Sequence, residues 1–263
     1  MPQTHSLPLV LAVGGHDPCG GAGVQADLEA IAANGCQALS VITALTCQTS
    51  CGVRQVLPQP AVQVLDHCLA LFEDSPVAAI KLGLLGQATT AGTLAGLLGV
   101  HPGLPAVLDP VLHSGGGLPL ADAALRTALV KDLAPRCTLM TPNTLEARAL
   151  SGQHQLRDCA AALTECGCPA VLITGTHDPG DQVVHRLYDA DELLWEGAWE
   201  RLPGEFHGSG CTLASAAAAG LALGKPLLAA VTNALDYSWH CLARALVTGR
   251  CQLTPNRFYR FRP

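Results

Sequence analysis

Charged residues are scarce in this sequence, and the basic ones do not cluster. Charged side chains make up 14% of the 263 residues, and 21 acidic against 15 basic residues leave a formal net charge of −6. Proteins that bind nucleic acid gather Lys and Arg into patches that neutralise phosphates, and polybasic segments mark proteins that bind membrane surfaces. The sequence therefore predicts neither nucleic acid nor a membrane as a partner.

Long apolar runs are lacking as well. A membrane-spanning helix needs about 20 consecutive apolar residues, and Gly or Pro interrupts the apolar runs before that length. The stretch 6–15, SLPLVLAVGG, has neither the basic leader nor the small-residue cleavage site of a secretory signal. We therefore expect a cytoplasmic protein.

The cysteines and histidines lack metal-binding spacing. None of the 12 cysteines forms a C-x-x-C pair, and the 10 histidines show no ligand pattern. A chain of this length can bury about 75% of its unfolded surface and needs no disulfide to hold it. We expect most cysteines to be reduced, small core residues, which leaves a redox or metal protein as the least favoured interpretation.

What the sequence does contain is an alternation of short apolar runs with helix-like stretches. The runs are rich in Val and Ile and nearly continuous, as in strands that are buried on both faces. The expected strands are 8–13, 38–45, 77–83, 105–111, 137–142 and 169–175. The expected helices between them are 22–34, 60–74, 88–99, 119–131, 143–150 and 155–167. This order predicts parallel βαβ units with helices on both faces of a sheet.

The pattern changes after residue 175. Residues 181–202 alternate in polarity, which indicates antiparallel strands at a sheet edge. Two helical stretches follow, 210–223 and 226–247, joined by a Gly/Pro stop and restart. Since no linker, repeat or low-complexity tract interrupts the chain, we expect one domain over 1–263.

A glycine turn precedes the first of these helices, in FHGSGCTLASAAAAG (206–220). Gly208, Ser209 and Gly210 allow the backbone to approach a ligand, and the free amides of a helix N-terminus attract anions. Cys211 lies in the first helical turn, where a thiol is expected to have a lowered pKa and could accept a proton from a substrate hydroxyl. The alternatives are a purely structural turn and a buried structural cysteine.

A second glycine loop, GGHDPCGGAG (14–23), follows the first strand. In a dinucleotide fingerprint the glycines follow the strand at once, whereas HDPC intervenes here, and the Lys-Ser/Thr pair of a P-loop is missing. The interpretation is a loop that closes over a small substrate, with Asp17 and Gln25 nearby. A plain βα connection is the alternative.

Asn143 and Glu146 open a further helix, in TPNTLEARAL (141–150). Asn-x-x-Glu is a capping box. The same residues follow a strand, at the edge where α/β sheets bind ligands, and could hold the water shell of Mg²⁺. Both interpretations can hold together.

Other polar residues also follow expected strands. The Gln48 amide pairs a donor with an acceptor and suits the edge of a heteroaromatic ring, with a turn residue as the alternative. Asp109 could face phosphates, and Thr174, Gly175 and His177 could contact a nucleotide. His177 could equally be an ordinary loop residue.

Several of these segments, read in order, resemble one known family over nearly the whole chain. They are GHDPCGGAGVQADL, VITALTCQTSCGV, KLGLL, VLDPV, TPNTLEA and HGSGCT. They resemble the hydroxymethylpyrimidine/phosphomethylpyrimidine kinases of thiamine biosynthesis, which belong to the ribokinase-like superfamily. The resemblance implies a ribokinase-like three-layer α/β/α sandwich with a mostly parallel central sheet of eight to nine strands, and a homodimer. It also implies phosphorylation of 4-amino-5-hydroxymethyl-2-methylpyrimidine by ATP with Mg²⁺, and then of the monophosphate to the diphosphate.

The resemblance also implies roles for individual residues. Cys211 matches the catalytic cysteine, Gly208 to Gly210 match the anion hole, and Asn143 with Glu146 match the Mg²⁺ motif. The positions that match the pyrimidine pocket are Gly15, Ala22, Gln48, Leu84 and Val111. This chain departs from the family where methionine is common at Leu84, where Asn-Thr-His is common at 205–207, and where a lysine is usual after LDPV.

Two other functions fit some of these residues. A pyridoxal kinase of the same superfamily also phosphorylates a hydroxymethyl group on a nitrogen heterocycle. A non-catalytic pyrimidine sensor would use the same scaffold but would need a broken anion hole or metal motif, and both are intact in this sequence.

Overall fold

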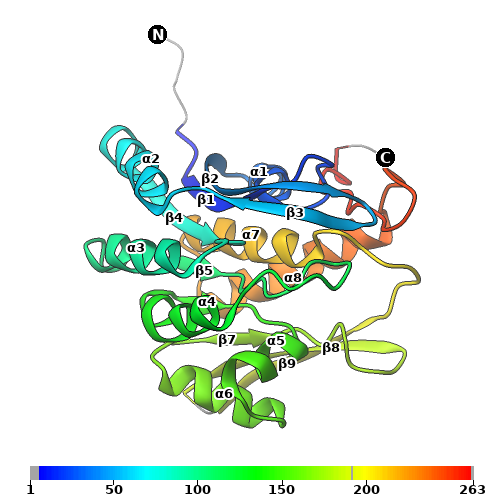
Figure 1. Ribbon diagram of the computed structural model, residues 1–263. Coiled ribbons are helices and arrows are strands. Elements are labelled where there is room, and N and C mark those ends of the chain that lie inside the picture. Colours follow the sequence, from blue (N-terminus) through cyan, green and yellow to red (C-terminus); the bar gives the residue numbers. More distant parts are fainter. Residues whose placement is uncertain (1–5, 191, 262–263) are drawn as a thin grey trace.

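A nine-stranded sheet organises the chain in the computed structural model, which describes residues 6–190 and 192–261 (Figure 1). The strands are β1 (Leu9–His16), β2 (Gln37–Thr49), β3 (Gly52–Pro58), β4 (Val77–Leu82), β5 (Ala106–Leu108), β6 (Leu139–Met140), β7 (Val171–Ile173), β8 (Gln182–Asp189) and β9 (Glu192–Glu200). Their spatial order is β3-β2-β1-β4-β5-β6-β7-β8-β9. Six neighbouring strands at the centre of this order are parallel: β2, β1, β4, β5, β6 and β7. At the two edges, β3, β8 and β9 pair antiparallel. The mostly parallel sheet that the sequence predicts is confirmed.

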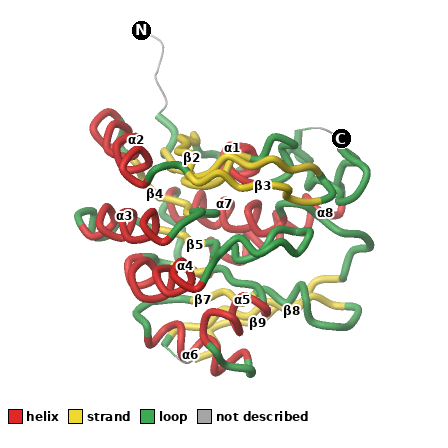
Figure 2. Tube along the Cα trace, viewed as in Figure 1, coloured by secondary structure: helices red, strands yellow, loops and turns green. Residues whose placement is uncertain are grey.

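The helices cover both faces of this sheet (Figure 2). They are α1 (Gly23–Ala33), α2 (Ala61–Asp74), α3 (Ala88–Gly99), α4 (Ala123–Ala128), α5 (Thr144–Ser151), α6 (Leu156–Glu165), α7 (Ser209–Ala222) and α8 (Leu227–Ala243). A π turn (Leu129–Leu133) and a 3₁₀ turn (Ala134–Arg136) continue α4. One apolar core lies between the sheet and α2 to α6, and the other lies between the sheet and α1, α7 and α8. Strand alternation explains the division, because Leu11 and Val13 of β1 enter the first core while Val10 and Ala12 enter the second.

Helix α7 lies close to the sheet because its side chains are small. Residues 212–220 are all buried, and most of them are alanine. At Gly220 an added Cβ would lie 3.0 Å from the Cβ of Ala230, so α8 packs tightly on the other side of α7. This packing fixes the direction in which the N-terminus of α7 points.

Strand β3 was missed by the sequence analysis. We expected the second strand to end at residue 45, whereas β2 runs to Thr49 and turns back at 50–51 into β3. Gln48 therefore lies within β2, opposite Val53, and the prediction that it follows the strand was wrong. The extension carries the edge of the sheet beyond the neighbouring strands.

Six of the cysteines are free and buried, three are free and exposed, one is free and partly exposed, and two form a disulfide. Cys36, Cys68, Cys137, Cys159, Cys168 and Cys241 are free and buried, as expected. Cys51, in the β2–β3 turn, is bonded to Cys251 near the C-terminus, so these two are not among the cysteines that are expected to be reduced. The two cysteines are 200 residues apart in sequence, and spacing along the chain could not reveal them. Among the described residues, no helix is both long and apolar enough to cross a membrane.

Candidate active site

The predicted site residues lie where the parallel strands end. Gly15 is near the end of β1, Leu84 follows β4, and Asp109 follows β5. Asn143 and Thr174, which follow β6 and β7, pair in an isolated parallel bridge. Because parallel strands end at the same edge of a sheet, these residues share one side of the molecule, which is where open α/β sheets bind ligands.

The two glycine turns interlock at this edge. Gly208 has a φ of +87°, and a Cβ added there would lie 2.0 Å from the carbonyl oxygen of Gly21. A Cβ added at Gly21 would in turn lie 2.2 Å from Cδ2 of His207. A larger residue at Gly208 would require the backbone to move, and one at Gly21 would displace the His207 ring. The absence of two side chains thus brings the N-terminal glycine loop directly against the start of α7.

The start of α7 presents free amides. Gly208 is the N-cap residue, and the amide of Thr212 is the first to donate within the helix, to Gly208 O at 3.0 Å. The amides of Ser209, Gly210 and Cys211 precede it and form the positive end of the helix dipole. A Cβ at Gly210 would be 3.7 Å from Asp109 Oδ1, so this anion-attracting turn faces a carboxylate. A phosphate placed there would therefore require a cation beside Asp109.

Cys211 is partly exposed at this turn, but its thiol is not acidic. Burial raises the pKa of Cys211 to about 12, and the charges of Asp109 and Asp27 add to the increase. Lys81 and the backbone amide of Gly23 lower the pKa of Cys211, but their effect is smaller than the increase. The predicted lowering of this pKa was wrong, because burial of the thiol outweighs the effect of the helix N-terminus and the nearby Asp109 and Asp27 add to the increase.

A buried charge network lies beneath the thiol. Lys81 Nζ is 2.8 Å from Asp27 Oδ1 and 3.8 Å from Asp109 Oδ2, and Ser215 Oγ donates to Asp27 Oδ1 at 2.8 Å. Burial alone would lower the pKa of Lys81, but Asp27, Cys211 and Asp109 raise it above its ordinary value. Lys81 is therefore a permanent positive charge beside Asp27, Asp109 and Cys211. Lys81 was not predicted as a site residue, although a lysine inside the apolar strand VAAIKLG indicates a buried ion pair.

Glu146 faces the same space from α5. Burial raises its pKa to about 8, and the charge of Asp109 contributes to the increase. Its Oε2 accepts from the Asn143 amide at 2.9 Å, while Asn143 Oδ1 accepts from the amides of Leu145 and Glu146. The predicted capping box is confirmed. Since Asn143 Oδ1 already accepts two hydrogen bonds, it could contact an ion only through water.

The two buried carboxylates fit a hard divalent cation. Asp109 Oδ2 has no hydrogen-bond donor among the described residues, and the charge of Asp109 helps to raise the pKa of Glu146. A cation bound by both carboxyl groups would favour loss of the Glu146 proton. Mg²⁺ prefers one or two carboxylates together with water and substrate phosphates. The donors present here match that preference.

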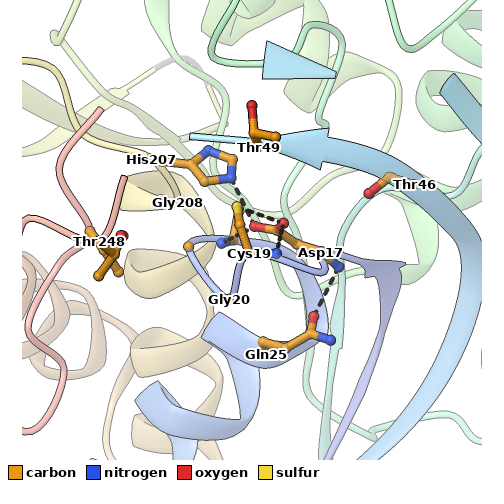
Figure 3. Close-up of polar contacts among 12 residues, drawn as sticks. Asp17, Cys19, Gly20, Gln25, Thr46, Thr49, His207, Gly208 and Thr248 are labelled. Carbon is orange, nitrogen blue, oxygen red and sulfur yellow. Dashed lines mark hydrogen bonds and ion pairs between the residues drawn. The ribbon is translucent and has the colours of Figure 1, made fainter. Parts of the chain in front are cut away.

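The loop after β1 gathers several predicted pocket residues. A Cβ on Gly15 would lie 2.8 Å from Leu84 Cδ2, so these two are in contact. Ala22 donates its amide to Asp17 Oδ2 at 2.8 Å, and Gln25 Oε1 accepts from the Asp17 amide at 2.9 Å (Figure 3). Val111, after β5, is half-buried and its amide donates to Asp109 O at 2.9 Å.

The predicted nucleotide residues after β7 are less closely held. The amide of Thr144 donates to Thr174 O at 3.1 Å, which joins this turn to α5. Gly175 is packed against the backbone of β8, where a Cβ would lie 2.1 Å from Val184 O. His177 is exposed and forms no hydrogen bond or ion pair within the described part of the chain. The structure thus brings Thr174 next to Asn143 but leaves His177 at the rim.

Comparison with known proteins shows which family the chain is similar to. The sequence model of the phosphomethylpyrimidine kinase family matches residues 17–256. A hydroxymethylpyrimidine/phosphomethylpyrimidine kinase from Rhizobium meliloti is 38% identical over 239 residues, which cover 87% of this chain and 88% of the relative. The kinase of the same name from Streptomyces coelicolor is 40% identical over 236 residues, covering 88% and 87%.

The chain belongs to the phosphomethylpyrimidine kinase family. A pyridoxal kinase from Staphylococcus aureus in complex with pyridoxal matches its fold with a TM-score of 0.87 at 25% identity, covering 98% of this chain and 96% of that one. A phosphomethylpyrimidine kinase from Clostridium difficile matches with a TM-score of 0.77 at 30% identity, covering 89% and 99%. The protein is a kinase with the ribokinase-like fold that the sequence predicts.

One further residue of this kinase was missed from the sequence. Arg257 is only 1% exposed, and its Nε donates to Thr212 Oγ1 at 2.9 Å while Nη1 pairs with Glu29 at 3.1 Å. Nη2 also donates to the carbonyl of Gly21. The C-terminal segment thereby clamps the glycine loop to α7. Nothing in PNRFYR indicated this, because its partners lie some 45 to 236 positions away.

Proposed function

We propose that this kinase transfers the γ-phosphoryl group of ATP to the hydroxymethyl group of 4-amino-5-hydroxymethyl-2-methylpyrimidine. In a second reaction it phosphorylates the monophosphate to the diphosphate, for thiamine biosynthesis. Family membership supports the substrate class. The observation that carries the proposal within the structure is the contact between the two glycine turns, because it puts a substrate loop against an anion-attracting helix start that carries a thiol.

We assign the substrate side to the ends of β1, β2 and β4. Gly15 and Leu84 would contact the ring on its apolar side, and the Gln48 amide would pair with the ring edge. Asp17, Ala22 and Val111 complete the predicted pocket. The alcohol would then point toward Cys211.

We assign the phosphate side to the start of α7. The amides of Ser209, Gly210 and Cys211 would bind the transferred phosphoryl group, and Lys81 would add a fixed positive charge below it. Phosphoryl transfer has a loose transition state, so positioning and charge stabilisation contribute more than a strong base does. Cys211, whose pKa is raised to about 12 by burial, first has to lose its own proton to solvent, and Lys81 favours that loss. The thiolate would then take the proton of the alcohol.

The nucleotide and its cation would lie along β5 to β7. Glu146 and Asp109, with Asn143 through water, would hold Mg²⁺, which supplies charge stabilisation to the ATP phosphates. Thr174 and Gly175 would contact the nucleotide, with His177 at the rim. Use of ATP is supported by a solved pyridoxal kinase from Staphylococcus aureus in complex with AMP-PCP, which matches this fold with a TM-score of 0.86 at 25% identity.

The test is the kinetics of Cys211→Ser. We expect kcat to fall far more than KM rises, because the thiol acts on the reacting alcohol rather than on binding. An unchanged kcat would remove Cys211 from the chemistry. Rescue of kcat by higher pH in the wild type, but not in the variant, would identify the thiol proton as the one that is lost.

Pyridoxal is the second candidate substrate. The specific observation in its favour is the pyridoxal kinase fold match described above. Comparing kcat/KM for the pyrimidine and pyridoxal alcohols would separate the two. ATP turnover with either alcohol would exclude a non-catalytic sensor. We further propose a single catalytic domain over 1–263 that works as a homodimer in the cytoplasm, which sedimentation and cell fractionation would check.

A further inference from the structure

Three side chains of different chemistry converge beside the glycine loop (Figure 3). Asp17 lies in the middle, where its Oδ1 accepts from Cys19 Sγ at 2.9 Å and its Oδ2 lies 2.8 Å from His207 Nε2. One ligand atom from each residue lies within 4.8 Å of the other two. A carboxylate oxygen, a sulfur and an imidazole nitrogen thus face a common point.

This donor set differs from that of the Mg²⁺ site. Thiolate and imidazole select borderline-soft cations such as Zn²⁺, whereas Mg²⁺ takes oxygen ligands. Tetrahedral zinc with protein bond lengths places its ligand atoms about 3.3–3.6 Å apart. The two hydrogen-bonded pairs at 2.8 and 2.9 Å would therefore separate only slightly on binding. Three protein ligands leave a fourth position for water or substrate.

The backbone holds these groups in place. The amides of Cys19 and Ala22 donate to the two oxygens of Asp17, which is only 1% exposed. Burial alone would raise the pKa of Asp17, but the bonds from His207, Cys19 and Ala22 lower it well below its ordinary value, so the carboxylate is charged. His207 is fixed because its ring packs on Gly21. Cys19 is exposed, so an ion could reach the group from solvent.

We propose that Asp17, Cys19 and His207 bind one Zn²⁺ ion, or a cation of similar softness, and that the bound ion inhibits the kinase. On binding, the sulfur–metal bond replaces the S–H bond of Cys19, and the thiol proton is released to solvent. The ring proton of His207 moves from Nε2, where it faces Asp17, to Nδ1, so that Nε2 can bind the ion. Because binding releases a proton, it would strengthen with rising pH.

Inhibition follows from where the ligands lie. His207 immediately precedes Gly208, at the start of α7. Asp17 accepts a hydrogen bond from the amide of Ala22, which belongs to the glycine loop. A metal bonded to both segments would tie the loop to the start of α7 and put an open coordination position beside the substrate. This part of the inference depends on the function proposed above, whereas binding of the ion does not.

Co²⁺ is the probe for binding, because a cobalt–thiolate bond gives a charge-transfer absorption that zinc does not. Titration of the full-length protein should give that band with one equivalent of Co²⁺, and Zn²⁺ should abolish it. Cys19→Ser keeps a donor to Asp17 but removes the soft ligand, so its band should be lost. Cys166→Ser is the matched control, since Cys166 is another exposed free cysteine, and its band should persist.

Activity is the second measurement. Zn²⁺ should inhibit the wild type and Cys166→Ser, with reversal by a chelator, while Cys19→Ser should need roughly 10- to 100-fold more Zn²⁺. A band of equal strength in Cys19→Ser would overturn the site, and a band without inhibition would overturn the regulatory part. If the wild type transfers no phosphoryl group to the pyrimidine, the proposed function fails, but the cobalt band still decides the metal site.

Discussion

The two halves of the candidate site are built differently. Around β1, β4 and α7, glycine turns interlock without room for a Cβ, and charged groups such as Lys81 are buried and paired. Beyond β7, the turn that carries His177 is exposed and is held mainly by Arg201, which donates to the carbonyls of Thr176 and Gly180. Groups that act on the reacting atoms need fixed positions, whereas a nucleotide can be held by several weaker contacts. Substitutions in the first half should therefore affect kcat and stability, and those in the second half should have small effects on both.

The largest effect is expected where the first half depends on a buried charge. Lys81→Met should lower the free energy of unfolding by about 3–5 kcal/mol, because it leaves Asp27 and Asp109 buried without their cation. Urea denaturation at neutral pH measures this loss. The double variant Lys81→Met/Asp27→Asn should recover part of it, and a double variant no more stable than the single one would contradict the pairing.

Gly208→Ala tests the interlocked turns. The added Cβ would meet Gly21 O at 2.0 Å, so the start of α7 has to shift and kcat should fall by about 10²–10³-fold, as when an anion-hole donor is lost. Gly224→Ala is the control, since Gly224 also has a positive φ, of +74°, but no atom lies within 4 Å of the added Cβ. It should lose only about 1–2 kcal/mol of stability and keep its kcat. Equal kcat losses in the two variants would show that strain alone, and not the contact, is responsible.

Glu146 lies between the two halves, and its raised pKa predicts that the free energy of unfolding depends on pH. Its pKa is about 8 in the folded protein against 4.5 ordinarily, so between these values the native state keeps a proton that the unfolded state has lost. The stabilising contribution is therefore complete below the unfolded pKa and is lost as pH rises toward 8. Urea denaturation from pH 5 to pH 8 in a chelator should show a decline in the wild type that is smaller in Glu146→Gln. Parallel curves would mean that Glu146 is not responsible.

The smallest effect is expected at the rim. His177→Ala should change the KM for ATP by no more than about twofold and stability by within about 0.5 kcal/mol, because the side chain is exposed and makes no polar contact in the described structure. Steady-state kinetics with ATP varied would measure this. A tenfold rise in the KM for ATP would contradict the expectation that substitutions in the second half have small effects.

The fold was predictable because its signals are local. Continuous apolar runs and intervening helical stretches gave the parallel centre of the sheet, and Asn-x-x-Glu gave the cap of α5. Strand β3 was not predicted because GVRQVLP is short and largely exposed, so it lacks the continuous apolar run by which the buried strands were identified. The site residues near glycine turns and strand ends were found for the same local reason.

The electrostatics of the site were not predictable in this way. The pKa of Cys211 depends on Asp27 and Asp109, which reach it from α1 and from the end of β5. The same holds for Lys81 and Arg257, whose partners are distant in sequence. A charged residue in an apolar strand indicates that a partner exists, but only the packing of the sheet and helices says which one.

The bond between Cys51 and Cys251 closes a covalent ring of the polypeptide, since the two residues are 200 positions apart. A protease that cut once inside this ring, for instance in the exposed residues 115–118, would open it without releasing either piece. The clipped molecule would keep its mass apart from one added water and would come apart only when a reductant was present. Nicked and intact forms of this enzyme would therefore migrate together until the sulfur link was broken.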